Sequence, residues 1–225
     1  MTPKLQLALD TLSMNEAIRL AHLLQDYWEI LEIGTTLLLA EGLESVRQFR
    51  RTFPEATLLA DTKIVDAGAV LAGAACEAGA DLVTVISAAS TKTIQSAAKA
   101  AHECGAEVLL DHLGETWSSD ALPGLGELGV DRIGLHLPID LQGDHIIQPD
   151  IVHSIVEIVP LPVSLAGGIT AEKVTQLCDT GVEVFVVGGY LLKADDPVAH
   201  AKLLRSALAG SSYELNHIKN KETYF

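Results

Sequence analysis

The chain has 225 residues, enough for one large domain with a substantial core. Apolar residues make up 48% of the sequence, which predicts a globular protein. A net charge of −15 argues against nucleic acid or an anionic membrane as the main partner. No apolar run approaches the roughly 18 residues of a membrane span, and no signal-type segment opens the sequence.

Three cysteines, Cys76, Cys104 and Cys178, lie in segments with helical spacing. Their number is odd and their separations do not match those of metal ligands, so we expect three reduced, half-buried thiols. This usage of cysteine favours a cytoplasmic protein.

Short β-type runs alternate with segments whose apolar residues recur every three or four positions. Several of the helical segments end in a glycine that can adopt the left-handed conformation, and a strand follows at once. Eight such units predict a single-domain (β/α)8 TIM barrel over residues 1–209, with an open doubly wound sheet as the alternative. A C-terminal tail, residues 210–225, has no assigned role. The eight expected strands are residues 5–10, 29–34, 57–61, 81–87, 107–112, 132–137, 162–168 and 183–189.

In a barrel of this kind the carboxyl ends of the strands form the face that carries the active site. Polar residues or glycines stand at seven of the eight predicted ends, which is more than chance placement explains. The sequence therefore predicts that these residues converge on one site. They are Asp10, Glu32, Asp61 with Lys63, Asp111, His136, Gly167–Gly168 and Gly188–Gly189.

Two carboxylates, Glu32 and Asp61, are expected on neighbouring strands, where they could share a hard divalent cation. Mg²⁺ suits such a pair because it binds through one or two carboxylates and keeps water for exchange with substrate oxygens. The alternative is that one carboxylate simply pairs with Lys63. Lys63 lies between Asp61 and Asp66 in sequence, so we expect it to stay protonated and to stabilise a developing enediolate.

Of the eight histidines, His136 stands at a predicted strand end inside the barrel mouth, which makes it a candidate acid/base. His112 comes just after another strand end. Asp10 either holds Lys63 in place or binds a substrate hydroxyl. The remaining assignable histidines fall on predicted helices; they are His22, His102, His153 and His200.

The glycine pairs Gly167–Gly168 and Gly188–Gly189 follow the seventh and eighth predicted strands, where barrels of this type often bind phosphate through loop N–H groups. Phosphate held by backbone groups is compatible with an acidic chain. Two ordinary turns are the alternative. Together with the carboxylates, the lysine and the histidine, these turns indicate enediolate chemistry on a sugar phosphate.

Six segments carry a resemblance to the orotidine-5′-monophosphate decarboxylase suprafamily, over about residues 4–209. The likeness is greatest to its branch of 3-hexulose-6-phosphate synthases and 3-keto-L-gulonate-6-phosphate decarboxylases. The Asp-x-Lys-x-x-Asp pattern at residues 61–66, together with "EIGT", is specific to the suprafamily. The segments are "LQLALD" (5–10), "EIGT" (32–35), "ADTKIVDAG" (60–68), "AGADLVTV" (78–85), "AGGI" (166–169) and "ADDP" (194–197).

The resemblance implies a homodimer with active sites at the subunit interface. It implies Mg²⁺ on Glu32 and Asp61, enediolate stabilisation by Lys63 and proton transfer by His136. Asp66 is expected to reach into the partner's site. These roles are expectations carried over from the family.

Four positions distinguish the two activities of the branch. The decarboxylases carry glutamate, arginine, threonine and arginine where this chain has Asp111, Ile139, Ala166 and Gly189, and all four departures resemble the synthases. The resemblance therefore implies an aldolase that joins formaldehyde to D-ribulose 5-phosphate, giving D-arabino-3-hexulose 6-phosphate, with Asp111 orienting the reacting groups. Decarboxylation of 3-keto-L-gulonate 6-phosphate is the alternative, and a sugar-phosphate-binding barrel without turnover is a lesser one.

Overall fold

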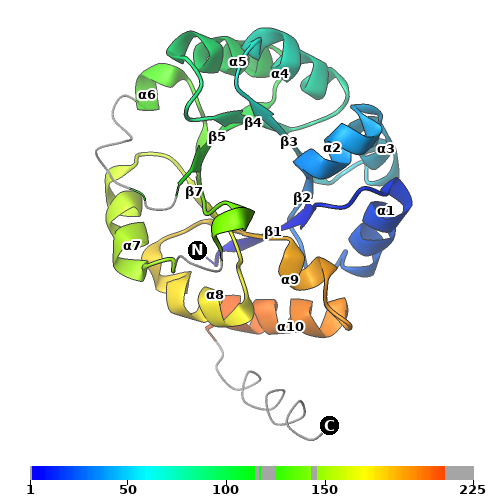
Figure 1. The fold of residues 1–225 in the computed structure, drawn as a ribbon, viewed down its shortest axis with the longest axis vertical. Coiled ribbons are helices and arrows are strands. Elements are labelled where there is room, and N and C mark those ends of the chain that lie inside the picture. Colours follow the sequence, from blue (N-terminus) through cyan, green and yellow to red (C-terminus); the bar gives the residue numbers. More distant parts are fainter. Residues whose placement is uncertain (1, 115–116, 118–124, 143–145, 211–225) are drawn as a thin grey trace, which may run out of the picture.

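The computed structural model describes residues 2–114, 117, 125–142 and 146–210, and in it eight parallel strands close into a barrel. Each strand pairs with the next along the chain, and β8 pairs with β1. Figure 1 shows the helices as a ring around these strands. The predicted TIM barrel is confirmed. The strands are β1 Lys4–Leu9, β2 Ile30–Ile33, β3 Thr57–Ile64, β4 Leu82–Ile86, β5 Glu107–Leu113, β6 Arg132–His136, β7 Val163–Ala166 and β8 Val184–Val187.

Helices fill the connections between strands, and two connections are more elaborate than a single βα unit predicts. Two helices lie between β2 and β3, and two follow β8. The helices are α1 Met14–Leu23, α2 Thr35–Glu41, α3 Glu44–Thr52, α4 Gly68–Glu77, α5 Thr91–Glu103, α6 Leu125–Leu128, α7 Pro149–Ile158, α8 Ala171–Leu177, α9 Gly189–Leu192 and α10 Pro197–Leu208, with 3-10 turns η2 Ile139–Leu141 and η3 Cys178–Thr180.

Local sequence signals account for many of the helix ends. The side chains of Ser13, Ser90 and Asp196 accept hydrogen bonds from backbone N–H groups in the first turns of α1, α5 and α10. Glycines with positive φ stand just after several helices, as the sequence predicts, and let the chain turn at once into the next strand. These glycines are Gly79, Gly105, Gly129 and Gly181.

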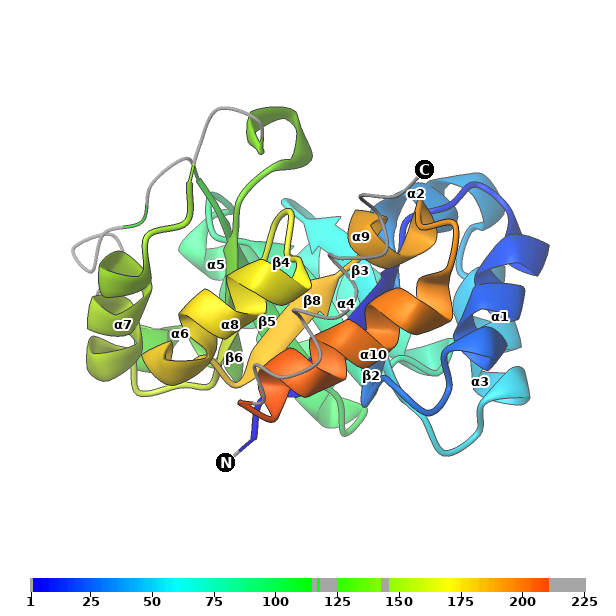
Figure 2. The same ribbon diagram turned by 90° about the horizontal axis from the view of Figure 1, so that it is seen from below.

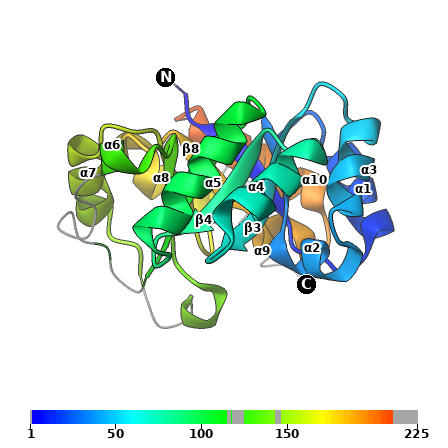
Figure 3. The same ribbon diagram turned by 90° about the horizontal axis from the view of Figure 1, so that it is seen from above.

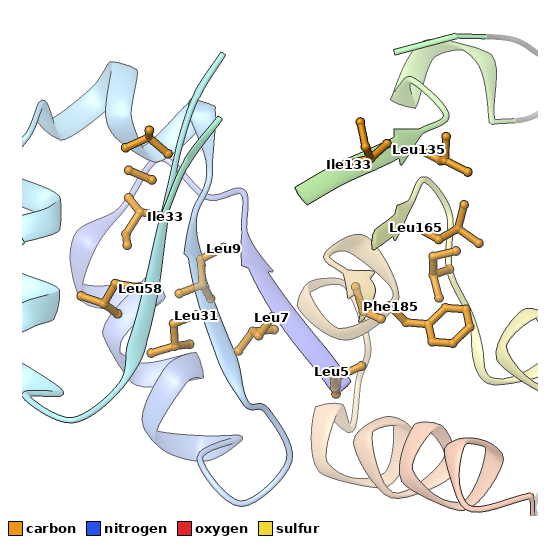
Figure 4. Packing of buried hydrophobic residues seen from close by; sticks show 14 of the residues in the cluster. Leu5, Leu7, Leu9, Leu31, Ile33, Leu58, Ile133, Leu135, Leu165 and Phe185 are labelled. Carbon is orange, nitrogen blue, oxygen red and sulfur yellow. The ribbon is translucent and has the colours of Figure 1, made fainter. Parts of the chain in front are cut away.

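The alternation of side chains along each strand gives two separate apolar clusters. One set points outward and packs against the helices; Figure 4 shows Leu7, Leu31 and Phe185 among its members. In Figure 3, α4 and α5 lie side by side over the strands, and Figure 2 shows α8 beside α10 on another side of the barrel. The other set fills the barrel interior below the mouth and consists of Ile30, Leu59, Leu82, Leu109 and Val184.

The structure corrects two details. β3 continues to Ile64 rather than ending at Asp61, because the chain re-pairs with β4 after an irregularity between Ala60 and Ile64. Cys104 is exposed at the end of α5, whereas the other two cysteines are half-buried as expected. No helix in the described part of the chain is long and apolar enough to cross a membrane. The predicted tail lies outside the described residues from position 211 onward.

Candidate active site

A cavity of about 850 Å³ opens at the carboxyl ends of the strands. Residues two apart on a strand share a face, so the inward positions that carry the interior apolar cluster also carry polar residues nearer the mouth. Leu59 and Asp61 illustrate this on β3, and Lys63 also lines the cavity. The structure brings all but one of the predicted site residues into the cavity wall: Asp10, Glu32, Asp61, Lys63, Asp111, His136, Gly167, Gly168, Gly188 and Gly189.

Lys63 lies between two carboxylates at the centre of this wall. Its Nζ is 3.0 Å from Asp61 Oδ2 and 2.9 Å from Asp111 Oδ2. Burial opposes the charge, but the two carboxylates outweigh it and raise the pKa of Lys63 above its ordinary value. Lys63 therefore remains an ammonium, as predicted, although the second carboxylate beside it is Asp111 on β5 rather than Asp66.

Asp61 is held from three sides and is 5% exposed. Thr35 Oγ1 donates to Asp61 Oδ2 at 2.6 Å, and Thr84 Oγ1 donates to Asp61 Oδ1 at 2.8 Å. Lys63 supplies the third contact, on the cavity side. The orientation of this carboxylate is therefore fixed before any ligand arrives.

Asp111 links the lysine to the histidine. His136 Nδ1 lies 3.2 Å from Asp111 Oδ1, while Oδ2 of the same carboxylate binds Lys63. Burial tends to raise the pKa of Asp111, but the hydrogen bond and charge of His136, with the charge of Lys63, lower it overall. The carboxylate of Asp111 therefore binds both His136, which can donate or accept a proton, and the positively charged Lys63. His112, the next residue, instead contacts Ser87 Oγ through Nδ1.

Glu32 lies deeper in the barrel, and its Oε2 accepts a hydrogen bond of 2.6 Å from Gln6 Nε2. Burial first, and then the charges of Asp61 and Asp10, raise the pKa of Glu32 well above its ordinary value. Asp10, at the rim, accepts a long hydrogen bond of 3.4 Å from Thr36 Oγ1. Among the described residues Lys63 forms its ion pairs with Asp61 and Asp111 rather than with Asp10, which leaves a substrate hydroxyl as the role open to Asp10.

These carboxylates fit a divalent cation on chemical grounds. β2 and β3 are neighbours with Glu32 opposite Leu59, which places Asp61 two residues further along on the same inward face. Burial and the repulsion by Asp61 and Asp10 raise the pKa of Glu32, and a bound cation would relieve the repulsion. Within the described ranges, no three metal-type side chains form a complete metal site, and Mg²⁺ needs only one or two carboxylates with water in its other positions.

The glycine turns after β7 and β8 line the cavity on the side away from the carboxylates of β2 and β3. Gly167 has φ +111°, and a Cβ there would collide with the backbone oxygen of Leu137. Two lysines that the sequence reading did not single out lie near these turns. Lys173 Nζ is 3.2 Å from where a Cβ on Gly168 would lie, and Lys193 lines the cavity next to the second turn. Positive charge is therefore available beside the backbone.

Asp66 is the predicted site residue that does not join the others. It is exposed, and its Oδ1 accepts a hydrogen bond of 2.8 Å from the backbone N–H of Ala67. It does not line the cavity of its own chain.

Three buried or half-buried polar residues of the site were missed by the sequence reading: Gln6, Thr35 and Thr84. Gln6 and Thr84 each stand alone in an apolar strand, and only the two-residue periodicity could have found them. Counting back from Asp10 in steps of two gives Gln6, and counting on from Leu82 gives Thr84, both on the inward face. Thr35 follows the "EIG" segment directly and could have been read with it.

Comparisons with known proteins agree with this geometry. A 3-hexulose-6-phosphate synthase of Staphylococcus epidermidis is 34% identical over 208 residues, covering 92% of this chain and 99% of that protein. The crystal structure of the Salmonella typhimurium 3-hexulose-6-phosphate synthase is 31% identical with a TM-score of 0.86, covering 92% of this chain and 98% of the other. That of a Vibrio cholerae 3-keto-L-gulonate-6-phosphate decarboxylase is 29% identical with a TM-score of 0.82, covering 93% and 98%. These relatives are named as enzymes, which confirms the prediction that this protein is an enzyme. With the family model matching residues 3–204, the chain belongs to the orotidine 5'-phosphate decarboxylase / HUMPS family.

Proposed function

We propose that this protein is a Mg²⁺-dependent aldolase that condenses formaldehyde with D-ribulose 5-phosphate, reversibly, to D-arabino-3-hexulose 6-phosphate. The observation that carries the proposal is the shared carboxylate of Asp111, which holds the Lys63 ammonium and His136 together in one cavity. The synthase names of the relatives at 31% and 34% identity support it.

The chain's own residues suit the chemistry of an enediolate. A base removes a proton from C1 of the sugar phosphate, and the electron pair of that C–H bond moves into an enediolate. Lys63 stabilises the negative charge on its oxygens. C1 then attacks the carbonyl carbon of formaldehyde while the C2 carbonyl of the sugar re-forms. The oxygen that came from formaldehyde takes a proton from His136, which Asp111 orients.

Glu32 and Asp61 would hold the metal, which supplies Lewis-acid charge for the substrate oxygens when bound. Asp10 is placed at the rim, where it can accept a hydrogen bond from a substrate hydroxyl. The glycine turns at Gly167 and Gly188 offer backbone N–H groups to the phosphate, with Lys173 and Lys193 as nearby positive charges.

The proposal includes a homodimer in which Asp66 of one subunit completes the partner's site. Asp66 is exposed in a single chain, and exposed apolar residues flank it: Val65 is 62% exposed, Val70 71% and Leu71 46%. Such residues on and beside the β3–α4 segment are what a second copy would cover.

Incubating the purified protein with Mg²⁺, formaldehyde and ribulose 5-phosphate should consume formaldehyde and form a hexulose phosphate. A chelator should stop the reaction, and added Mg²⁺ should restore it. Lys63→Ala should abolish turnover, whereas Lys99→Ala, which removes an exposed lysine on α5, should not. If folded wild-type protein with saturating Mg²⁺ consumes no formaldehyde, the proposal is wrong.

The decarboxylase activity remains the second candidate, because a solved decarboxylase of the branch is 29% identical to this chain. Both reactions pass through a similar enediolate, so the two substrates should be compared directly by kcat/KM on one preparation. We expect the aldol reaction to have the higher value. A higher value for 3-keto-L-gulonate 6-phosphate would reverse the assignment.

A further inference from the structure

Thr84 lies at the centre of the contacts that shape the site, although its own hydroxyl has no obvious part in the chemistry. It stands on β4 and is 3% exposed. Its Oγ1 donates to Asp61 Oδ1 at 2.8 Å and accepts from the backbone N–H of Lys63 at 2.8 Å. A single hydroxyl group therefore contacts both Asp61, a proposed metal ligand, and the backbone of Lys63, which is proposed to stabilise the enediolate.

The backbone at Lys63 needs such support. Its φ is +44°, a left-handed value that L-residues other than glycine rarely adopt, and it falls within the irregular pairing of β3 with β4. Conformations of this kind persist only where surrounding contacts hold them in place. The carbonyl oxygen of Thr84 gives a further contact, since it accepts a hydrogen bond of 2.9 Å from Thr62 Oγ1.

The irregularity has a direct consequence for the direction of the lysine. Because three residues separate Ala60 from Ile64 without regular pairing, the β-sheet alone does not determine the position of the Lys63 Cα. The ammonium nevertheless lies within 3.1 Å of oxygens on both Asp61 and Asp111. The hydrogen bond from the Lys63 N–H to Thr84 Oγ1 holds the backbone at this point, from which the side chain extends between them.

We propose that Thr84 is a positioning residue: its hydroxyl fixes the left-handed backbone at Lys63 and the rotamer of Asp61, and so aims the ammonium at the reacting oxygens. The kinetic part of this inference rests on the proposed function, whereas the structural part does not. Thr84 lines the cavity, but its hydroxyl proton is donated to Asp61 and its oxygen accepts from the Lys63 N–H, so we assign it no proton transfer of its own.

The first test replaces the hydroxyl by a methyl group of similar size in Thr84→Val. We expect kcat to fall about 100-fold, because a small misplacement of a catalytic group has effects of this size. KM for the sugar phosphate should stay within about threefold, since the glycine turns on the far side are unchanged. Thr180→Val is the matched control: Thr180 is also buried, and its hydroxyl donates to Leu177 O far from the cavity.

A second readout does not depend on turnover. Hydrogen exchange at the Lys63 amide, followed by NMR, should be at least about tenfold faster in Thr84→Val than in wild type, because the amide has lost its acceptor. Thr180→Val should leave it unchanged. If wild type lacks aldolase activity, this measurement still decides the structural part. An unchanged exchange rate in Thr84→Val, or an unchanged kcat in an active enzyme, would overturn the proposal.

Thr84→Ser and Thr84→Ala differ by one oxygen atom. Comparing them shows whether the hydroxyl group positions Lys63, even if Thr84→Val does not fold. Serine should keep kcat and Lys63 amide protection within about threefold of wild type, whereas alanine should lose both. Equal losses in serine and alanine would show that packing of the methyl group, rather than the hydroxyl, matters, and would contradict the proposal.

Discussion

Glu32 is the least favourably placed charge in the cavity, because burial and two neighbouring carboxylates all oppose its ionisation. Lys63 stands in the opposite situation, with two carboxylates that favour its charge. The charged form of Asp111 is also favoured, since His136 and Lys63 hold the pKa of Asp111 below its ordinary value. The site thus places one carboxylate where either a proton or an added cation would stabilise it.

Glu32→Gln should therefore make the metal-free protein more stable at pH 7–8. The raised pKa means that the folded chain binds a proton more tightly than the unfolded chain, whose Glu32 titrates near 4.5. Stability falls as pH rises from 4.5 through the raised folded pKa, and the variant removes this loss. The glutamine oxygen can still accept from Gln6. We expect Tm to rise by at least about 3 °C.

The control for this prediction is Glu103→Gln, which removes an exposed carboxylate on α5 and should leave Tm nearly unchanged. Added Mg²⁺ should raise the Tm of wild type but not that of Glu32→Gln, because binding to the folded state alone stabilises it. A lower Tm in metal-free Glu32→Gln would show that the carboxylate is not the strained group inferred here.

Single residues show what could and could not be predicted from sequence. Glu32, Asp61 and His136 could be found because each interrupts an apolar run near its end. The pairing of Lys63 with Asp111 could not, because 48 positions separate them and β5 comes near β3 only through the pairing of both strands with β4. The carboxylate nearest Lys63 in sequence after Asp61, Asp66, does not contact it within one chain, because local sequence separation is a poor guide where the strand is irregular.

Among the elements, helix ends and strand starts were predicted best, because glycines such as Gly105 and Gly181 act locally. The length of β3 could not be predicted, since the charged residues after Ala60 are unusual in a strand and their burial depends on β4 and β5. The division of the β2–β3 connection into α2 and α3 also escaped prediction. Gly42, with φ +65°, marks that division.

The turn after β7 provides a prediction at this scale. Gly167→Ala should raise KM for the sugar phosphate at least about tenfold and should lower stability, because φ is +111° and the new methyl group would meet Leu137. Gly105→Ala is the matched control, with a positive φ of +77° and open space around it. Both variants can be measured by steady-state kinetics and thermal unfolding.

Gly105→Ala shares the backbone penalty but not the collision or the position at the cavity, so it should lose stability with an unchanged KM. If Gly167→Ala keeps a wild-type KM despite lower stability, the turn does not contact the phosphate. The test thereby separates the role of the turn in folding from its proposed role in binding.

At the scale of the whole molecule, the barrel closes its own core and contains nearly every group that the proposed reaction needs. The exception is Asp66, which does not line this cavity and which the proposal assigns to the partner's site. A closed barrel leaves the β3–α4 segment with exposed apolar residues, including Val65 and Val70. A two-fold dimer formed there would cover them and would bring each Asp66 to the partner's cavity.

Mixing two inactive variants tests this arrangement. Lys63→Ala and Asp66→Asn should each abolish turnover while remaining folded and dimeric; asparagine can still accept the Ala67 N–H. Equal mixing with random subunit exchange makes half of the dimers heterodimers, each with one site that has both groups and one that has neither. About 25% of wild-type activity should therefore return. No recovery, with exchange verified by native mass spectrometry, would show that Lys63 and Asp66 do not meet across an interface; the aldolase proposal would stand without the shared site.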